Sequence, residues 1–438
     1  MGHELHEGNT LEALVGIGNT HFRILEDKSE NVWWFRVPFA VVLEFRAMAT
    51  IQGPSTAGDV LALVRDGATT RSDLGRLTGL SRTAVAARVG ALLRSGLVIE
   101  ASDEPGVSTG GRPPSQLRFN RDAGVVLAGA IGRSRTQVAV CDLDGTVLAG
   151  TDVDQEIGVS PDELMPAVVG AFAELLERVA RPASSVRTVG LSIPGTVDID
   201  RGASLDSPIM TGWDGVPLAP YLEGLTGAPV FVENDANAMA LSERRGHLEQ
   251  HRDLIFLKAS TGIGIGVVVD GRLVRGRWGA AGEIGHTKVT AAEGLACRCG
   301  DTGCLEVLAG GWALVRRAEE AGLKVTHVRD LAARAVGGDA EARRLIREAG
   351  RRTGEVLAAA VNLLNPEVVV VGGDLAAAYD SYVAGLRESL YAQASALATR
   401  ELSIVPLTHR EHAGVVGCAA LALGQVLAPA AVDRALTS

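Results

Sequence analysis

The chain has 438 residues, of which 47% are hydrophobic and 21% charged, and its formal net charge is −10. This length predicts two to three domains, and the negative charge excludes a protein that coats nucleic acid with its whole surface. A small basic patch can still attract phosphates over about 10 Å. No apolar run reaches the roughly 18–20 residues of a membrane span, and no basic segment opens a signal peptide, so we expect a cytoplasmic protein without membrane contact.

Residues 1–47 show neither helix caps nor a clear hydrophobic period, although they contain the Trp33–Trp34 pair and an apolar run from Val37 to Leu43. Met48 then opens a stretch typical of a chain start, which suggests that the preceding segment results from a misplaced start. We leave residues 1–47 unassigned as an extension and expect little structure in it.

Residues 48–120 have the pattern of three helices followed by a β-ribbon. Thr70 and Ser81 are suitable N-caps for the second and third helices, and Gly79 separates these two helices. The two strands of the ribbon are predicted at Leu97–Glu100 and Gln116–Phe119. This order predicts a winged helix-turn-helix domain, a fold that binds DNA.

The third predicted helix is basic, because the segment from Ser81 to Val98 contains three arginines and no acid. Phosphate contacts need positive charge, and Ser, Thr and Arg at a helix start can reach base edges in the major groove. We expect DNA contacts from Ser81, Arg82, Thr83, Arg88 and Arg112. Arg112 lies in a loop that either reaches the minor groove or is a rigid linker. The alternative for the whole domain is a small helical module that binds protein.

The third domain is expected at residues 121–430, where strands and helices alternate as in an α/β protein with two lobes. Strands are predicted at 125–130, 137–141, 188–193, 230–232, 254–258, 265–269 and 368–371, and helices at 163–179, 310–321, 328–365 and 414–426.

Three of the five cysteines lie within eight residues, in a loop that also contains two glycines. Cys297, Cys299 and Cys304, together with His286 eleven residues upstream, form a complete tetrahedral ligand set. Soft thiolates favour zinc, and a site without an open position indicates a structural ion. The alternative is a turn with reduced thiols.

Asn234 and Asp235 follow a predicted strand and open a helix. A carboxylate there can take a proton from a sugar hydroxyl, whereas the alternative is that Asp235 is only a helix N-cap. Glu283, His286 and Glu306 lie on either side of the cysteine loop and offer acceptors for a polyol, so the combined set favours sugar binding.

These motifs resemble the ROK family of repressors and sugar kinases, and specifically its regulators with a winged head. The resemblance covers about residues 53–425. It is carried by the head and by 193–195, 233–237, 260–266, 282–286, 297–306, 365–366 and 372–373. It implies an actin-like, hexokinase-type fold of two lobes with the sugar in the cleft. It also implies zinc at His286, Cys297, Cys299 and Cys304, and sugar contacts at Asn234, Asp235, Glu283, His286 and Glu306. Asp235 is at the position of the kinases' catalytic base.

The first hairpin departs from the family's kinases, which have Asp-x-Gly-Gly-Thr where this chain has Ala130–Ser134. Ala130 replaces the acid that serves the nucleotide's metal, and Arg133 replaces a glycine of the phosphate turn, where it could pair with a phosphate of the ligand. Without that acid phosphoryl transfer loses electrostatic stabilisation, so we do not expect ATP or Mg²⁺ as cofactors. Ile209 also stands where a polar sugar contact is expected.

We therefore expect a transcriptional repressor that binds operator DNA and responds to a sugar or sugar phosphate. The family resemblance and the need for paired heads predict a homodimer or homotetramer. The alternatives are an ATP-dependent kinase for glucose or an N-acetylhexosamine with a regulatory head, in which Asp235 would be catalytic, and a sugar-binding interaction protein.

Overall fold

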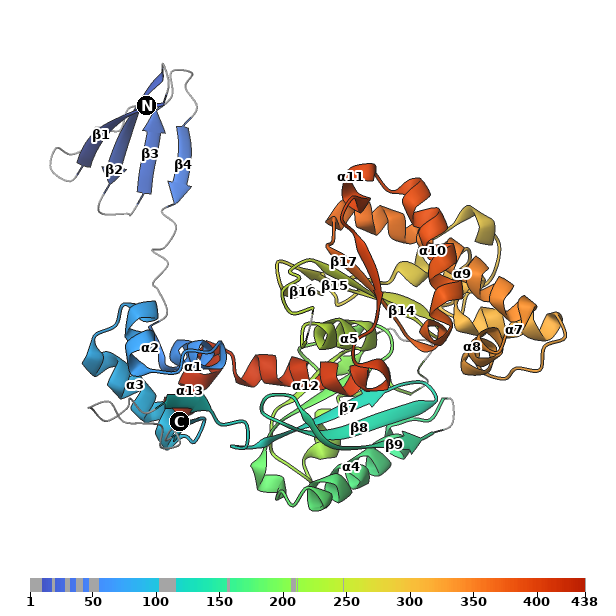
Figure 1. The fold of residues 1–438 in the computed structure, drawn as a ribbon, viewed down its shortest axis with the longest axis horizontal. Helices are drawn as coiled ribbons and strands as arrows, with labels where there is room; N and C mark the ends of the chain where they lie inside the picture. The colour runs from blue at the N-terminus through green and yellow to red at the C-terminus, as the bar shows by residue number, and fades with distance from the viewer. Residues whose placement is uncertain are drawn as a thin grey trace, which may run out of the picture.

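The computed structural model describes residues 10–17, 20–27, 32–36, 42–46, 55–101, 116–155, 158–205, 210, 212–246 and 248–437. Arg112 and Ile209, which the sequence analysis singled out, lie outside these residues. The described chain contains an amino-terminal sheet, a small helical head and a body of two lobes (Figure 1).

The amino-terminal extension contains paired strands, where the sequence led us to expect little structure. The strands β1 (Thr10–Ile17), β2 (Thr20–Asp27), β3 (Val32–Arg36) and β4 (Val42–Arg46) form an antiparallel sheet in chain order. These segments are rich in β-branched and aromatic residues, which favour strands. The sequence predicted no strand here because apolar and polar residues do not alternate regularly, as in Val32–Arg36, where four apolar residues follow one another.

The head has the predicted three helices and wing. It consists of α1 (Ala57–Arg65), α2 (Arg71–Thr78), α3 (Arg82–Arg94) and the antiparallel pair β5 (Val98–Ala101) and β6 (Gln116–Phe119). Thr70 and Ser81 cap α2 and α3 as expected, each accepting a hydrogen bond from the backbone N–H three residues later. Gly79 ends α2 in the left-handed region, with φ of 71°.

The first lobe is a five-stranded sheet in the order β13-β10-β7-β8-β9. Its strands are β7 (Val125–Ile131), β8 (Arg135–Asp142), β9 (Val147–Asp154), β10 (Val186–Ile193) and β13 (Val230–Asn234), with the short pair β11 (Val197–Asp198) and β12 (Ala203–Ser204) beside it. One face packs on α4 (Pro161–Arg178) and the other on α12 (Ala413–Val426). The strands β7, β10 and β13 are parallel, so their carboxyl ends share one edge.

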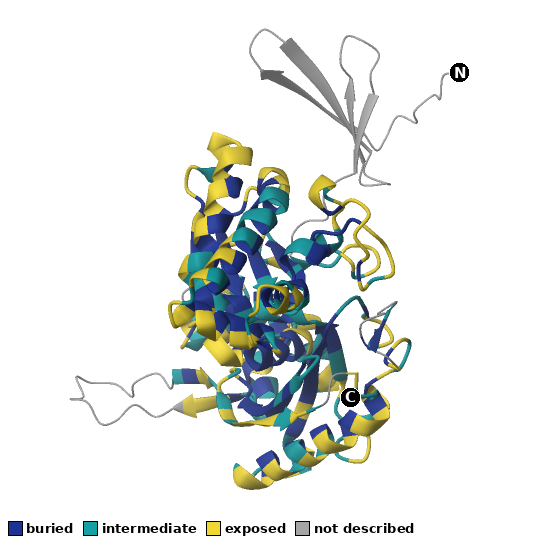
Figure 2. Ribbon diagram, turned by 90° about the vertical axis from the view of Figure 1, so that its right-hand side faces the viewer, coloured by how far each residue is buried: buried dark blue, intermediate teal, exposed yellow. Residues whose placement is uncertain are grey.

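The second lobe is a five-stranded sheet in the order β16-β15-β14-β17-β18. Its strands are β14 (Leu254–Ala259), β15 (Ile263–Val269), β16 (Arg272–Val274), β17 (Val368–Gly372) and β18 (Ser403–Pro406). Its helices are α5 (Asp235–Glu243), α6 (Glu306–Ala309), α7 (Gly311–Glu320), α8 (Val328–Val336), α9 (Ala340–Leu364), α10 (Tyr379–Gln393) and α11 (Ala396–Thr399). Buried residues fill the interior of both lobes (Figure 2). This mixed α/β architecture confirms the predicted fold class.

The helix α12 crosses from the two-lobed body toward the head and continues as α13 (Pro429–Thr437), which packs on α1 (Figure 1). The backbone N–H of Gly58 donates to Asp433 Oδ1 at 2.9 Å. Head residues such as Val60 share one core cluster with Val432 of α13. The head is therefore joined to the body by its own chain and also by the carboxyl-terminal helix.

Within the described residues, no single helix is long and apolar enough to span a membrane. The segments 410–426 and 429–437 reach that length and composition only together, bent by 58°, and most of α12 is buried in the fold.

Backbone contact holds α12 in place, and this generates a first prediction. A methyl group on Gly417 would lie 1.9 Å from the carbonyl oxygen of Ala238 in α5, whereas one on Gly424 in the same helix meets nothing within 4 Å. We expect Gly417→Ala to lower the free energy of unfolding by about 2 kcal/mol or more, because overpacking forces the helices apart.

The matched control is Gly424→Ala, which should leave the stability unchanged or raise it by about 0.5–1 kcal/mol, since alanine is the better helix former. Urea unfolding of both variants measures the difference. Equal stability of the two variants would contradict the packing of α12 described above.

Candidate functional site

The recognition helix α3 presents its amino-terminal end to solvent. Ser81, Arg82 and Thr83 are exposed there, and Arg94 is exposed at the other end of the helix. Exposed polar and cationic side chains at a helix start are suited to phosphates and base edges. Three of the predicted DNA contacts thus lie on one accessible end of the helix.

Arg88 faces another way. Its Nε donates to the carbonyl oxygen of Ser55, and its Nη1 donates to that of Ala84 at 3.2 Å. The side chain therefore ties the segment before α1 to α3. That Arg88 also contacts DNA stays a prediction.

The predicted metal ligands lie together at the edge of the second lobe. One ligand atom from each of His286, Cys297, Cys299 and Cys304 lies within 4.8 Å of the others. The Nδ1 of His286 is 3.8 Å from the Sγ of Cys297. The loop can fold back on itself because Gly300 and Gly303 adopt φ of 90° and 80°. The cluster could hold one metal ion.

The charges around this cluster suit thiolate ligands. Lys288 Nζ lies 3.1 Å from Cys304 Sγ and 2.6 Å from Asp301. Burial raises the pKa of Cys297 to about 12, so without a metal ion that thiol keeps its proton. A bound cation would displace the proton and compensate for burial of the sulfur.

A cavity of about 1190 Å³ lies between the two lobes. All five predicted sugar-binding residues line it, namely Asn234, Asp235, Glu283, His286 and Glu306. They come from the carboxyl end of β13, the start of α5, and the segments on both sides of the cysteine loop. This is the edge where the parallel strands of the first sheet end.

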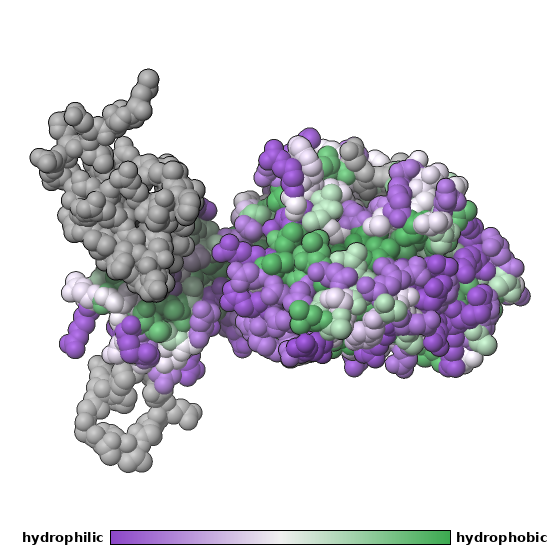
Figure 3. Space-filling model, turned by 90° about the horizontal axis from the view of Figure 1, so that it is seen from above, coloured by the Kyte–Doolittle hydropathy of each residue, from purple (hydrophilic) through white to green (hydrophobic). Residues whose placement is uncertain are grey.

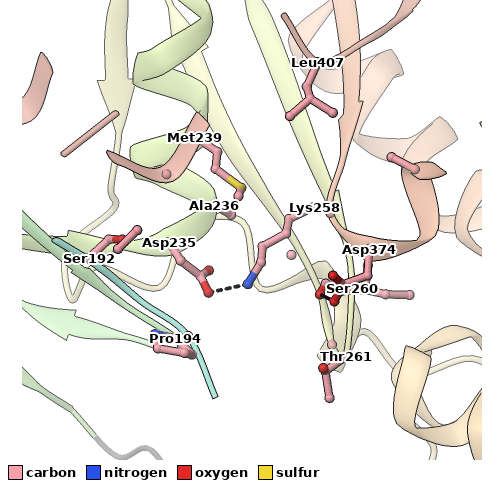
Figure 4. A pocket seen from close by; sticks show the side chains of 18 of the residues that line it. Ser192, Pro194, Asp235, Ala236, Met239, Lys258, Ser260, Thr261, Asp374 and Leu407 are labelled. Carbon is pink, nitrogen blue, oxygen red and sulfur yellow. Dashed lines mark hydrogen bonds and ion pairs between the residues drawn. The ribbon is translucent and has the colours of Figure 1, made fainter. Parts of the chain in front are cut away.

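Asp235 is ion-paired with Lys258 of β14 across the cavity (Figure 4). The side chains are 15% and 22% exposed, so this charge pair is largely removed from water. Sequence reasoning missed Lys258 as a site residue. The available signal was that Lys258 is the only charged residue in the otherwise apolar strand 254–259.

Asn234, and not Asp235, caps α5. The Oδ1 of Asn234 accepts from the backbone N–H groups of Ala236 and Asn237, at 2.8 and 3.1 Å, and its Nδ2 donates to the Gly195 carbonyl. The alternative that Asp235 serves only as the helix cap is therefore wrong. The capping role of Asn234 leaves the Asp235 carboxylate directed into the cavity.

His286 joins the metal cluster to the cavity. While its Nδ1 faces Cys297, its Nε2 lies 3.9 Å from Glu283 Oε2. Burial raises the pKa of the Glu283 carboxyl, and the neighbouring acids Asp235 and Glu306 add to that rise. The oxygens of Glu306 accept from Ile263 N and Trp312 Nε1, at 3.1 and 3.0 Å. A metal ion would thus fix the wall that carries these acceptors.

No carboxylate occupies the first hairpin at the cavity, since Ala130 lies at the end of β7. The nearby Ser260 hydroxyl donates to Asp374 Oδ2 in the second lobe. The cavity therefore combines a polar wall suited to hydroxyl groups with a hairpin that lacks a metal-binding acid.

The ROK family profile matches residues 126–425, and a winged helix-turn-helix DNA-binding profile matches residues 60–99. The chain is 27% identical to a xylose repressor of Caldicellulosiruptor bescii over 372 residues, which are 82% of this chain and 92% of the repressor.

Two solved structures, one of a regulator and one of a kinase, are similar to this chain. A ROK family transcriptional regulator, described as a homologue of the Escherichia coli MLC protein, superposes with a TM-score of 0.73 at 27% identity and covers 87% of this chain and 98% of its own. A ROK family glucokinase from Streptomyces griseus, in complex with glucose and AMPPNP, gives 0.60 at 30% identity and covers 68% and 99%. The kinase structure therefore matches 68% of this chain, whereas the regulator structure matches 87% of it.

Proposed function

The chain belongs to the ROK family, and on that premise we propose that it is a sugar-responsive, DNA-binding transcriptional repressor acting in the cytoplasm. One observation carries the proposal: similarity to a xylose repressor and to a ROK family transcriptional regulator extends over 82% and 87% of the chain, head included. The cavity between the lobes supplies the sugar site, at Asn234, Asp235, Glu283, His286 and Glu306. We propose two functional domains, a DNA-binding head at residues 48–120 and a sugar-binding body at residues 121–430.

The carboxyl-terminal helices connect the cavity to the head. Arg410 and Glu411, in the turn before α12, and Gly414, in the first turn of α12, line the cavity. The helix α12 leads to α13, and α13 contacts α1 through Asp433 and Gly58. A ligand that binds the closed form of the lobes better than the open form shifts the population toward closure. Movement of α12 and α13 then changes the positions of the heads on their half-sites.

We propose that the kinase reaction has been lost. Phosphoryl transfer needs an acid to hold the nucleotide's metal, and the first hairpin has Ala130 there. A general base needs a free carboxylate, but that of Asp235 is paired with Lys258. ATP and Mg²⁺ are therefore not cofactors of this protein, and Asp235 serves as a ligand-binding group.

We propose that the metal is zinc, held by His286, Cys297, Cys299 and Cys304. Three thiolates and one imidazole leave no open position, which is the pattern of a structural site. When bound, zinc would lock the loop that positions His286 and Glu306 at the cavity. No role in chemistry is assigned to it.

A homodimer or homotetramer is proposed because repressors bind two half-sites with paired heads. The ends of α9 and α11 offer an apolar surface for assembly, since Leu363 is 84% and Leu397 71% exposed. A hydrogen bond from Ser395 N to Asn362 Oδ1, at 2.8 Å, holds these helix ends together. Figure 3 views the molecule from above, where hydrophobic residues gather along the middle of the two-lobed body.

The function is tested with DNA from the region upstream of the protein's own gene. We expect binding in a gel shift or fluorescence anisotropy assay, and release by a sugar first identified in a thermal-shift screen, because ligand binding stabilises the fold. A coupled assay should show no ATP turnover with the same sugar. Robust turnover that Asp235→Asn abolishes would establish the kinase instead. Failure to bind DNA, with or without sugar, would favour a head that binds protein.

The recognition helix gives a second prediction. Arg82→Ala should weaken operator binding about 10-fold or more, because it removes an exposed cation from the helix start, and should leave thermal stability unchanged. The comparison variant Arg88→Ala should lower the stability of the head, since it breaks the hydrogen bonds to Ser55 and Ala84. Unchanged DNA affinity in Arg82→Ala would rule out the proposed orientation of α3 on DNA.

Metal content gives a third prediction. Elemental analysis should find one zinc per chain, and Cys299→Ser should lose the metal and melt at a lower temperature. The control Cys141→Ser alters a buried thiol of the first lobe and should retain zinc. A metal-free wild-type protein with the same melting temperature as the metal-loaded form would remove this assignment.

A further inference from the structure

The turn between β7 and β8 holds an arginine at the cavity. Gly132 makes the turn tight, because its N–H donates to the Arg135 carbonyl at 3.0 Å and a methyl group on Gly132 would lie 2.7 Å from that oxygen. Gln155 braces it by donating to the Gly132 carbonyl at 2.7 Å. Arg133, the next residue, lines the cavity. Its position is thus fixed by a braced hairpin.

Arg133 is half-buried at the cavity wall, and its guanidinium forms no ion pair with the described residues. Its Nε is buried without a hydrogen-bond partner, and within the described residues no carboxylate lies within 4 Å of it. By contrast, Arg135 on the same hairpin pairs with Asp152 at 3.0 Å, and Lys258 pairs with Asp235. Arg133 therefore differs from both neighbouring cations in the cavity wall.

The nearest acid does not neutralise Arg133. Glu306 attracts it, but both oxygens of Glu306 already accept hydrogen bonds, from Ile263 and Trp312. A second guanidinium, Arg298, stacks on the Trp312 ring at 4.5 Å and repels that of Arg133. Burial lowers the pKa of Arg133, and the charge of Glu306 offsets part of that effect. A guanidinium with a buried, unpartnered nitrogen costs stability, and a bound anion would offset that cost.

We propose that the effector is an anionic carbohydrate, whose phosphate or carboxylate group is bound by Arg133 while its hydroxyl groups face the polar wall of the cavity. This inference rests on the proposed function and narrows the class of effector. The planar guanidinium can donate two parallel hydrogen bonds to either group, and such charge-assisted bonds are stronger than bonds to a neutral hydroxyl. Exposed Arg329 and Arg410 at the cavity wall would attract the same charge.

Calorimetric titration of the full chain with matched neutral and anionic sugars tests the proposal. The probes are glucose, glucose 6-phosphate and glucuronate, then N-acetylglucosamine and its 6-phosphate, then xylose and xylose 5-phosphate. We expect an anionic member to bind most tightly, and Arg133→Gln to weaken that binding about 10- to 100-fold. Comparison of the phosphorylated sugars with glucuronate identifies whether Arg133 binds a phosphate or a carboxylate group. The control Arg187→Gln, at the opposite end of the same sheet, should bind as the wild type does.

A second readout needs no ligand. Because the Nε of Arg133 is buried without a partner, ligand-free Arg133→Gln should be at least as stable as the wild type in thermal unfolding, and clearly lower stability would overturn the proposal. Equal binding of neutral and anionic sugars, unaffected by Arg133→Gln, would overturn the anionic effector while leaving a sugar-responsive repressor. Loss of AMPPNP binding in Arg133→Gln, with sugar binding unchanged, would instead assign Arg133 to a nucleotide. Operator release by no sugar at all would contradict the proposed function itself.

Discussion

The connection between the two-lobed body and the head depends on the close packing of α12 against its neighbours. Its backbone touches two other elements, because Gly417 lies against the Ala238 carbonyl of α5 and the Cys418 carbonyl lies against Gly190 of β10. Interfaces this close cannot slide gradually, since packed interiors are nearly as dense as crystals. The helix begins at the sugar cavity and leads into α13, which contacts the head. A change in the cavity can therefore reach α1 as a rigid displacement of α12 and α13.

The cavity combines the polar wall of the proposed sugar site with a hairpin that carries no acid at Ala130. The polar wall is built around His286, which faces Cys297 with one ring nitrogen and Glu283 with the other. The opposite hairpin has Ala130 in place of an acid, followed by Arg133, whose Nε is buried without a partner. In our proposal, the missing acid leaves no group to hold a nucleotide's metal, and Arg133 makes the same place an anion site.

Helix caps and cysteine spacing made the helices of the head and the possible metal site predictable from the sequence. The caps Thr70 and Ser81 indicated where two helices of the head begin, and the spacing of the three cysteines predicted a set of ligands that the fold brings together and that could hold a metal ion. What the sequence could not show depends on contacts between distant segments, such as Lys258 with Asp235 and Gly58 with Asp433. The β1–β4 sheet was missed because its segments, such as Val32–Arg36, show no regular alternation of apolar and polar residues.

The central claim is that the ligand in the cavity and the operator at the head influence each other through one protein. Thermodynamic linkage requires this influence to be reciprocal. The most direct measurement is calorimetric titration of the identified effector into the free protein and into the protein saturated with operator DNA. The account predicts weaker effector binding to the DNA complex, by the same factor by which the effector weakens operator binding. Equal effector affinity in the two titrations would contradict it.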